Sequence, residues 1–339
     1  MLGMGNTVMA SESINPKTTP VIGVIEPGFA DYSVERRVLA PLGAEVRSLK
    51  WDGNRSVLLD QLRQVDVVLV RDTALDAEAI GHLKENGGIV RYGVGVDTID
   101  LEAAKRRGIR VANVPHYGAE IEVSDHAAAL TLALVRRVVS RNEQVMNKQW
   151  GLGQKEPIYR IGGSTLGLVG FGKIARAYLE RMRAFGVCDV LVYDPYVPDS
   201  VLEQHKVIRV EFDDLCRRAQ IISLHAPATA ENHNIINERT LSLMNKRTCL
   251  INSSRGGLVD VHALAGALKA GQIVGAALDV LDREPITEDC PLRGLKNVIL
   301  TDHTAWYSES SVGVLQEGGA RAAYEILTTG TPTNWVNRW

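Results

Sequence analysis

Short apolar segments alternate with longer segments of mixed polarity along almost the whole chain. The apolar segments carry no alternating polar positions, which is typical of parallel strands that are covered by helices on both faces. The first half is predicted to contain strands at 21–25, 67–70, 89–90 and 111–114, separated by helices at 33–40, 56–64, 76–86 and 100–107.

The same pattern resumes after residue 160 and predicts a second set of strands. Two sheets of ordinary size suit a chain of 339 residues better than one oversized sheet. The predicted fold class is therefore α/β, with two doubly wound parallel-sheet domains. The second set of strands is expected at 165–169, 190–193, 207–210, 221–225, 249–252, 274–280 and 298–301, and a last helix near 308–328.

The segment 121–139 joins the two halves and consists largely of Ala, Leu and Val, with Asp125 near its start. A helix that is apolar on all sides is buried. We expect this helix to lie between the domains, at a subunit interface, or both, and to support a homodimer.

Composition narrows the classes of protein. Apolar residues make up 45% and charged residues 23% of the chain, and the net charge of −2 provides no basic surface for nucleic acid or an anionic membrane. Four widely spaced cysteines without a CxxC pair favour reduced thiols in a cytoplasmic protein. No apolar segment reaches membrane-spanning length, and residues 1–20 are expected to form a disordered tail. The spacing of His116, His126, His205 and His225 predicts no metal site.

The segment 165–175 has the pattern of a buried strand, a glycine turn and the first turn of a helix. Gly170 permits the tight turn, Gly172 lets a pyrophosphate approach the backbone, and Ala175 lets the helix pack close to the strand. This glycine pattern alone would also fit a purely structural turn. However, Asp194 ends the next strand, 24 residues after Gly170, where an acid would meet the ribose hydroxyls of adenosine. Its carboxylate would repel a 2′-phosphate, which favours NAD over NADP.

Three later strands are each followed by a polar residue at their carboxyl ends. Arg255 could clamp a carboxylate, although an arginine beside two glycines could equally cap a turn. Asp279 and Glu284 would each, taken alone, be read as surface acids near a turn, and a single histidine such as His303 is more often structural. Because ligands bind outside the carboxyl ends of parallel strands, Arg255, Glu284 and His303 can converge on a nicotinamide.

Together these motifs resemble the D-isomer-specific 2-hydroxyacid dehydrogenase family over about 60–339. The segment 303–309 most resembles the branch that contains the C-terminal-binding-protein corepressors and their bacterial relatives. The family motifs occur in order at 93–100, 113–115, 122–125, 170–175 with Asp194, 252–256, Asp279 with Glu284 and Pro285, and His303.

The resemblance implies an NAD-dependent oxidoreductase that interconverts a D-2-hydroxyacid and a 2-oxoacid, with a Rossmann-type NAD domain inserted into a flavodoxin-like substrate domain. His303 would be the general acid and base, Arg255 would hold the substrate carboxylate, and Glu284 would pair with His303. Asp279 would contact the nicotinamide carboxamide. Besides Arg255, Asp279 and His303, the resemblance assigns to the cofactor Gly170, Phe171, Gly172, Lys173, Ile174, Asp194, His225, Ala226, Pro227, Ser253 and Ser254, and to the substrate Arg71, Val94, Gly95 and Trp306.

The expected substrate domain comprises 21–120 and 308–339, and the expected NAD domain comprises 121–307. Two alternatives remain open. One is an NAD(H)-sensing regulatory binding protein, which the resemblance to corepressors suggests. The other is a dehydrogenase of an unusual one-carbon or phosphorus substrate on the same fold. Trp306, three residues after His303, is predicted to pack on the substrate side chain and to favour large apolar or thioether 2-oxoacids.

Overall fold

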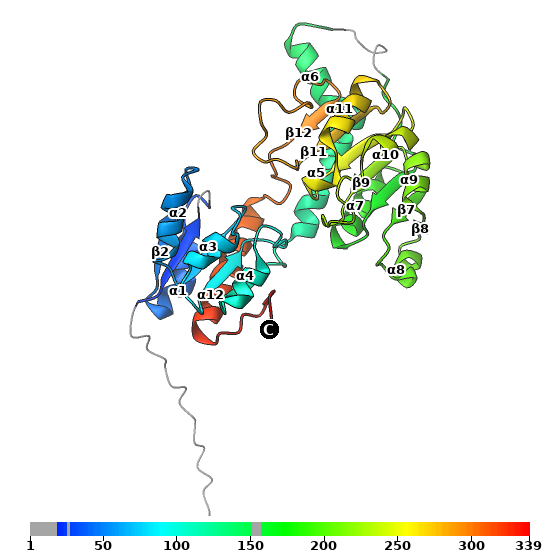
Figure 1. The fold of residues 1–339 in the computed structure, drawn as a ribbon. Coiled ribbons are helices and arrows are strands. Elements are labelled where there is room, and N and C mark those ends of the chain that lie inside the picture. The colour runs from blue at the N-terminus through cyan, green and yellow to red at the C-terminus, as the bar shows by residue number, and fades with distance from the viewer. Residues whose placement is uncertain (1–18, 26–27, 151–156) are drawn as a thin grey trace, which may run out of the picture. The chain divides into compact units, whose positions relative to one another are not determined.

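The computed structural model describes residues 19–25, 28–150 and 157–339, and it divides into two compact units (Figure 1). Unit 1 contains the described residues up to Tyr117 together with Ser308–Trp339, and unit 2 is Gly118–Tyr307. Unit 2 is therefore an insertion in the sequence of unit 1. The tail expected at 1–20 lies outside the described residues, except for its last two positions.

Unit 1 is a parallel sheet of five strands in the order β2-β1-β3-β4-β5. Its strands are β1 (Val21–Ile25), β2 (Glu45–Leu49), β3 (Val67–Val70), β4 (Gly88–Arg91) and β5 (Arg110–Asn113). Its helices are α1 (Ser33–Leu39), η1 (Ala40–Leu42), α2 (Arg55–Leu62), α3 (Ala77–His82), α4 (Leu101–Arg106) and α12 (Glu309–Thr328).

The middle of the unit 1 sheet is buried on both faces because helices cover it on each side. All four residues of β3 are buried, which explains its uninterrupted apolar sequence. The edge strand β2 has only Leu49 buried and contains three polar residues among its five, so the apolar pattern did not predict it. Helix α12 begins with a reciprocal cap between Ser308 and Ser311 and packs beside α1 and β4.

Unit 2 is a parallel sheet of seven strands in the order β12-β11-β10-β9-β6-β7-β8. The strand order reverses at β6, which makes the crevice beside β6 and β9 the expected place for a ligand. Its strands are β6 (Leu166–Val169), β7 (Val190–Tyr193), β8 (Ile208–Arg209), β9 (Ile221–Leu224), β10 (Cys249–Asn252), β11 (Gly275–Leu278) and β12 (Val298–Leu300). Its helices are α5 (Ala119–Val135), α6 (Val138–Met146), α7 (Lys173–Ala184), α8 (Asp199–Gln204), α9 (Phe212–Arg218), α10 (Glu238–Leu243), η2 (Gly256–Leu258) and α11 (Val261–Lys269).

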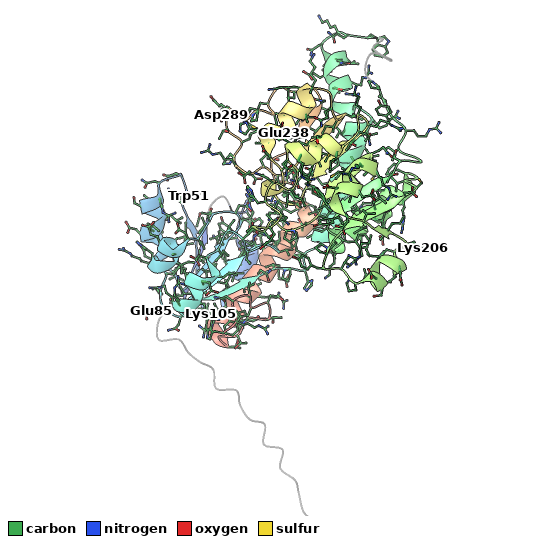
Figure 2. All side chains as sticks on the ribbon, turned by 45° about the vertical axis from the view of Figure 1, so that its right-hand side comes forward. Trp51, Glu85, Lys105, Lys206, Glu238 and Asp289 are labelled. Carbon is green, nitrogen blue, oxygen red and sulfur yellow. The ribbon has the colours of Figure 1, made fainter. Side chains whose placement is uncertain are left out.

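The two faces of the unit 2 sheet carry separate cores. In β10, Leu250 joins a core with side chains of α9, α10 and α11, whereas Ile251 joins a core with side chains of α5, α7 and α8. Successive residues of a strand point to opposite faces, so a strand that is covered on both sides is apolar at successive positions. Lys206 and Glu238 of this unit are exposed, and Figure 2 shows Lys206 at its edge.

The joining helix differs from the prediction. It was expected at 121–139, but α5 ends at Val135, and the chain turns at Arg137, whose φ of 54° is left-handed, before α6 begins. Most of the apolar surface of α5 packs inside unit 2, with Ala127 and Leu130 in its core. On α5 only Ile121, at 53%, is a large exposed apolar side chain, whereas α6 carries four, among them Met146 at 74%.

Candidate active site

The glycine turn lies between β6 and α7, at the carboxyl end of the strand where the order of the sheet reverses. Gly170 has a φ of 86°, and a Cβ there would lie 2.9 Å from backbone atoms of His225 and Ala226, so the position requires glycine. Gly172 is the N-cap of α7, and a Cβ added to it would meet nothing within 4 Å. The approach to the first turn of α7 is therefore open to a phosphate group.

Asp194 follows β7 and connects that strand to the glycine turn. One carboxylate oxygen accepts from the N–H of Phe171 at 2.8 Å, and the other accepts from the N–H groups of Tyr196 and Val197 at 2.9 and 3.1 Å. These bonds hold the carboxylate beside the turn, where it could meet an adenosine ribose. Arg209 in β8, which the sequence did not single out, donates to the carbonyl of Asp194 and not to its carboxylate.

His225, Ala226 and Pro227 follow β9, next to the glycine turn. The Nε2 atom of His225 lies 2.9 Å from Oγ of Ser223, and its ring packs at a tilt on Tyr178 with 5.1 Å between centroids. Burial lowers the pKa of His225 to about 3, so its ring is neutral at physiological pH. His225 therefore packs next to the glycine turn as a neutral ring and offers no positive charge to a phosphate.

The loop after β10 carries Ser253, Ser254 and Arg255, and a buried asparagine shapes it. The side chain of Asn252 accepts from the N–H and hydroxyl of Ser254 and donates to the carbonyl of Arg255 at 2.9 Å. A Cβ at Gly256 would overlap the carbonyl carbon of Leu281 at 1.9 Å, so the Arg255 loop lies directly against the segment that leads to Glu284. The guanidinium of Arg255 also donates to the carbonyl of Ser254, as a turn-capping arginine does.

Asp279 follows β11 and is 2% exposed. Burial by itself would raise the pKa of this carboxyl, but hydrogen bonds from His126, Thr301 and the N–H groups of Ala305 and Thr304 bring it down to about 2. The hydroxyl of Thr301 donates to Oδ1 at 2.5 Å, and the N–H groups of Thr304 and Ala305 donate to Oδ1 and Oδ2 at 3.0 Å each. The surface-acid interpretation is therefore wrong for Asp279. Its buried carboxylate accepts three hydrogen bonds from the loop after β12.

His303 and Glu284 form an ion-pair contact. The Nδ1 atom of His303 lies 2.7 Å from Oε2 of Glu284, and the N–H of Leu281 donates to the other carboxylate oxygen at 2.7 Å. His303 has a left-handed φ of 57°, and its N–H donates to the carbonyl of Asp279 at 2.8 Å. Trp306, further along the same loop, is half-buried and packs edge-on against Tyr307.

Arg71, Val94 and Gly95 lie in unit 1, on loops that follow β3 and β4. Arg71 pairs with Asp72 at 2.7 Å, and Val94 is 46% exposed, with its carbonyl accepting from the side chain of Asn113. These residues follow carboxyl ends of the unit 1 strands, which is where parallel sheets bind ligands.

In unit 2, the arrangement supplies an acid–base pair, an arginine and an open helix N-terminus along one edge of a single sheet. The loops that carry Arg255, Glu284 and His303 follow the neighbouring strands β10, β11 and β12. A protonated imidazole and a guanidinium can stabilise negative charge that develops on a carbonyl oxygen. Sequence reasoning missed Arg209, Asn252, Thr301 and the link from His126, because each works through contacts made by the folded chain.

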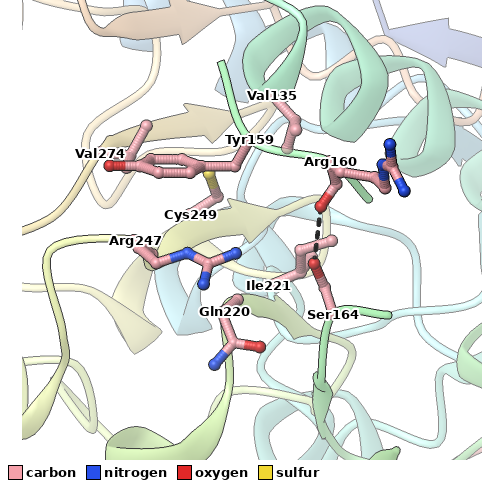
Figure 3. Close-up of a pocket in the computed structure, with 9 residues that line it drawn as sticks. All are labelled: Val135, Tyr159, Arg160, Ser164, Gln220, Ile221, Arg247, Cys249 and Val274. Carbon is pink, nitrogen blue, oxygen red and sulfur yellow. Dashed lines mark hydrogen bonds between the residues drawn. The ribbon is translucent and has the colours of Figure 1, made fainter. Parts of the chain in front are cut away.

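A small pocket at the opposite edge of the unit 2 sheet contains none of these residues (Figure 3). It lies beside the first residues of β9 and β10, where the guanidinium of Arg247 stacks 4.9 Å from the centroid of the Tyr159 ring. Cys249 also lines it, and burial raises the pKa of that thiol to about 12, so the thiol stays protonated. This pocket shows no acid–base chemistry.

Neither a metal cluster nor a membrane helix occurs in the part of the chain that the structure describes. Within 19–25, 28–150 and 157–339, no three His, Cys, Asp or Glu side chains gather as a metal site would require. No helix in those ranges is both long enough and apolar enough to cross a bilayer. All four cysteines are free thiols, two of them buried.

Comparison with known proteins places these features in a family. Residues 128–305, more than half of the chain, match the family model described as D-isomer specific 2-hydroxyacid dehydrogenase, NAD binding domain. The chain is 36% identical to a glyoxylate reductase of Thermococcus litoralis over 84% of this chain and 87% of that protein. It is 38% identical to a D-3-phosphoglycerate dehydrogenase of Methanocaldococcus jannaschii over 75% of this chain, but it spans only 48% of that longer relative.

Solved structures agree with this comparison. A D-lactate dehydrogenase from Aquifex aeolicus, complexed with NAD and lactic acid, matches with a TM-score of 0.81 and 26% identity, over 94% of this chain and 99% of that one. The TT0316 protein from Thermus thermophilus matches with a TM-score of 0.81 and 31% identity, over 93% and 99%. The sequence relatives are a D-3-phosphoglycerate dehydrogenase and a glyoxylate reductase, so the expected placement in the corepressor branch is not supported.

Proposed function

This chain belongs to the NAD-dependent D-isomer-specific 2-hydroxyacid dehydrogenase family, and we propose that it interconverts a D-2-hydroxyacid and a 2-oxoacid with His303 as the proton donor and acceptor. The observation that carries the proposal is the 2.7 Å contact between His303 and Glu284. It lies at the same sheet edge as the glycine turn and the Arg255 loop.

In the reducing direction, NADH, when bound, would supply the hydride that reduces the carbonyl carbon of the substrate. His303 gives its proton to the carbonyl oxygen as negative charge develops there, which yields the hydroxyl group. Glu284 stabilises the imidazolium form before the transfer and orients the ring through Nδ1. Arg255 holds the substrate carboxylate and polarises the carbonyl. In oxidation, neutral His303 accepts the hydroxyl proton.

The NAD site is proposed to use the two glycines of the turn and Asp194. Gly172 leaves open space at the N-terminus of α7 for the pyrophosphate, and Asp194 stands beside Phe171 for the adenosine ribose. The remaining cofactor contacts are proposed for Lys173, Ile174, His225, Ala226, Pro227, Ser253, Ser254 and Asp279.

The proposed substrate domain comprises 21–120 and 308–339, and the proposed NAD domain comprises 121–307. Backbone N–H groups of Val94 and Gly95 would bind the substrate carboxylate, and Arg71 would bind the distal part of the substrate. Trp306 offers a large, half-buried aromatic surface three residues after His303. We therefore propose a preference for large apolar or thioether 2-oxoacids over glyoxylate.

A homodimer is also proposed, and α6 supports it better than α5 does. Val138, Val139, Val145 and Met146 on α6 are each between 48% and 74% exposed, whereas most of α5 is buried in unit 2. An exposed apolar surface of this kind is typical of a protein interface. A second copy of the chain is the partner that a closed, symmetric contact requires.

The test is turnover of NADH with a panel of 2-oxoacids that runs from glyoxylate to large apolar side chains. We expect turnover of at least one substrate, a loss of roughly 10²–10⁴ in rate for His303→Asn, and a selective loss for the large substrates in Trp306→Ala. The matched control is Tyr307→Phe, which keeps the aromatic neighbour. NADH binding without turnover of any panel member would instead support a nucleotide-sensing protein. Turnover of formate or phosphite alone would instead support a dehydrogenase of a one-carbon or phosphorus substrate.

A further inference from the structure

His126 on α5 is a polar residue that neither the glycine turn nor the acid–base pair explains. Its Nε2 atom lies 3.1 Å from Oγ1 of Thr301 and 3.4 Å from Oδ1 of Asp279. The hydroxyl of Thr301 already donates its proton to Oδ1 of Asp279. The Thr301 oxygen must therefore accept from His126, which places a proton on Nε2. His126 and Thr301 are 175 residues apart in the sequence.

The contacts of His126 with Thr301 and Asp279 act on the loop that carries His303. The carboxylate of Asp279 accepts from the backbone N–H groups of Thr304 and Ala305, on the carboxyl side of His303. The backbone carbonyl of Asp279 accepts from the N–H of His303. The left-handed backbone of His303 is thus fixed on both sides by one aspartate. A rotation of that carboxylate would displace the ring that is proposed to transfer the proton.

Helix α5 gives His126 a rigid base. Ala127 and Leu130, on the same helix, are almost fully buried in the core of unit 2, and α5 packs against α7, β10 and β11. The side chain of His126 is 23% exposed, whereas that of Asp279 is 1% exposed. A donor fixed on a packed helix can hold a buried carboxylate in one orientation.

We propose that His126 is a positioning residue of the dehydrogenase: through Thr301 and Asp279 it holds the 301–305 loop in the shape that presents His303 to the substrate. The inference rests on the proposed function, since it assigns His126 a task in that reaction. It requires only the Nε2–H donor of His126, and no charge on the ring.

Hydrogen–deuterium exchange of the full-length, cofactor-free protein tests the structural half of the proposal. In His126→Leu and Thr301→Val, the amides of Thr304 and Ala305, followed in a peptide covering 301–307, should exchange faster than in the wild type, because their shared acceptor is no longer held. Thr301→Ser keeps the hydroxyl and should retain protection. The matched control is Thr131→Val, which removes a buried hydroxyl on α5 that contacts Tyr178 and not Asp279.

Kinetics test the functional half. His126→Leu should lower kcat by about 10- to 100-fold, as expected for a small displacement of a catalytic group, with a smaller change in KM for the 2-oxoacid. His126→Gln, whose Nε2–H can reach the same acceptor, should recover most of the loss. The double variant His126→Leu with Thr301→Val should be little slower than the slower single variant, because both act through one path.

Unchanged exchange at Thr304 and Ala305 in both His126→Leu and Thr301→Val would overturn the proposal. So would kinetic losses that multiply in the double variant, or a Thr131→Val variant that lowers kcat as much as His126→Leu does. If the wild type reduced none of the 2-oxoacids, the proposed function would fail. The exchange experiment on the cofactor-free protein would still decide whether His126 holds the loop.

Discussion

The contact between His303 and Glu284 should determine the pH at which His303 gains its proton, and the size of this effect can be estimated. Its two atoms are 2.7 Å apart, and the two side chains are 33% and 36% exposed, so solvent screens part of the attraction. Two unit charges about 4 Å apart attract by ~1 kcal/mol in water and by ~4 kcal/mol at an effective dielectric constant of about 20. A pair that is about one-third exposed falls between these figures and nearer the lower one. Removing the carboxylate charge should therefore move the midpoint of His303 protonation to lower pH by about one unit.

Glu284→Gln is the perturbation that keeps the shape of the side chain. The N–H of Leu281 donates to Oε1 of Glu284 at 2.7 Å, so the amide oxygen of the glutamine would remain there and its NH₂ group would face Nδ1 of His303. A donor at that position favours the neutral imidazole. Reduction needs protonated His303, so the alkaline limb of kcat/KM should move to lower pH by about one unit. Oxidation needs neutral His303, and its acidic limb should move to lower pH as well.

The assay is NADH absorbance at a series of pH values on both sides of neutrality, in both reaction directions. Glu238→Gln removes an exposed carboxylate at the start of α10, outside the candidate site, and should overlay the wild-type profile. If the Glu284→Gln profile also overlaid the wild type in both directions, Glu284 would not control the protonation of His303, and the assignment of the pair would be refuted.

Three further predictions follow from the same structure. Asp194→Ser should raise kcat/KM with NADP relative to NAD by at least roughly 10-fold, because a 2′-phosphate would no longer meet a carboxylate; an unchanged ratio would contradict the cofactor assignment. Asp279→Asn should lower the free energy of unfolding by about 2 kcal/mol at neutral pH, since the folded-state pKa is about 2. That stabilisation is present above the unfolded-state pKa near 4 and is lost as pH falls toward 2. Urea titrations in which the wild type and Asp279→Asn differ by the same free energy of unfolding at every pH would rule it out. Light scattering should give about twice the 37.0 kDa chain mass, and Val145→Glu with Met146→Glu should reduce it to one chain, whereas a wild-type monomer would exclude the dimer.

The fold was predictable where burial leaves a simple pattern in the sequence. β3 and β10 are covered on both faces, so β3 is continuously apolar and β10 is apolar up to its last residue, Asn252, and both could be recognised without the structure. β2 was missed because it is an edge strand in which only Leu49 is buried. The break between α5 and α6 was missed because both helices are rich in apolar residues, and only the left-handed backbone of Arg137 separates them.

The candidate site was predictable where a functional residue follows a strand. Arg255 and His303 could be found in this way, because the topology of a parallel sheet brings strand ends to one edge. Residues that act on those side chains could not be found, because their partners are distant in the sequence. Asn252 shapes the Arg255 loop from inside a buried strand, and its role is visible only through its hydrogen bonds.

Asp279 illustrates how two carboxylates in one site can be assigned different tasks. Its carboxylate is buried and has a pKa of about 2, so it is ionised at any pH at which the protein would work. A permanently charged acceptor can hold the N–H groups of Thr304 and Ala305 without responding to pH. Glu284 lies in a more exposed position beside a titrating imidazole, where its charge affects proton transfer directly. The pH dependence of the reaction should therefore arise from His303, and the geometry of the loop should be set separately by Asp279 and its donors.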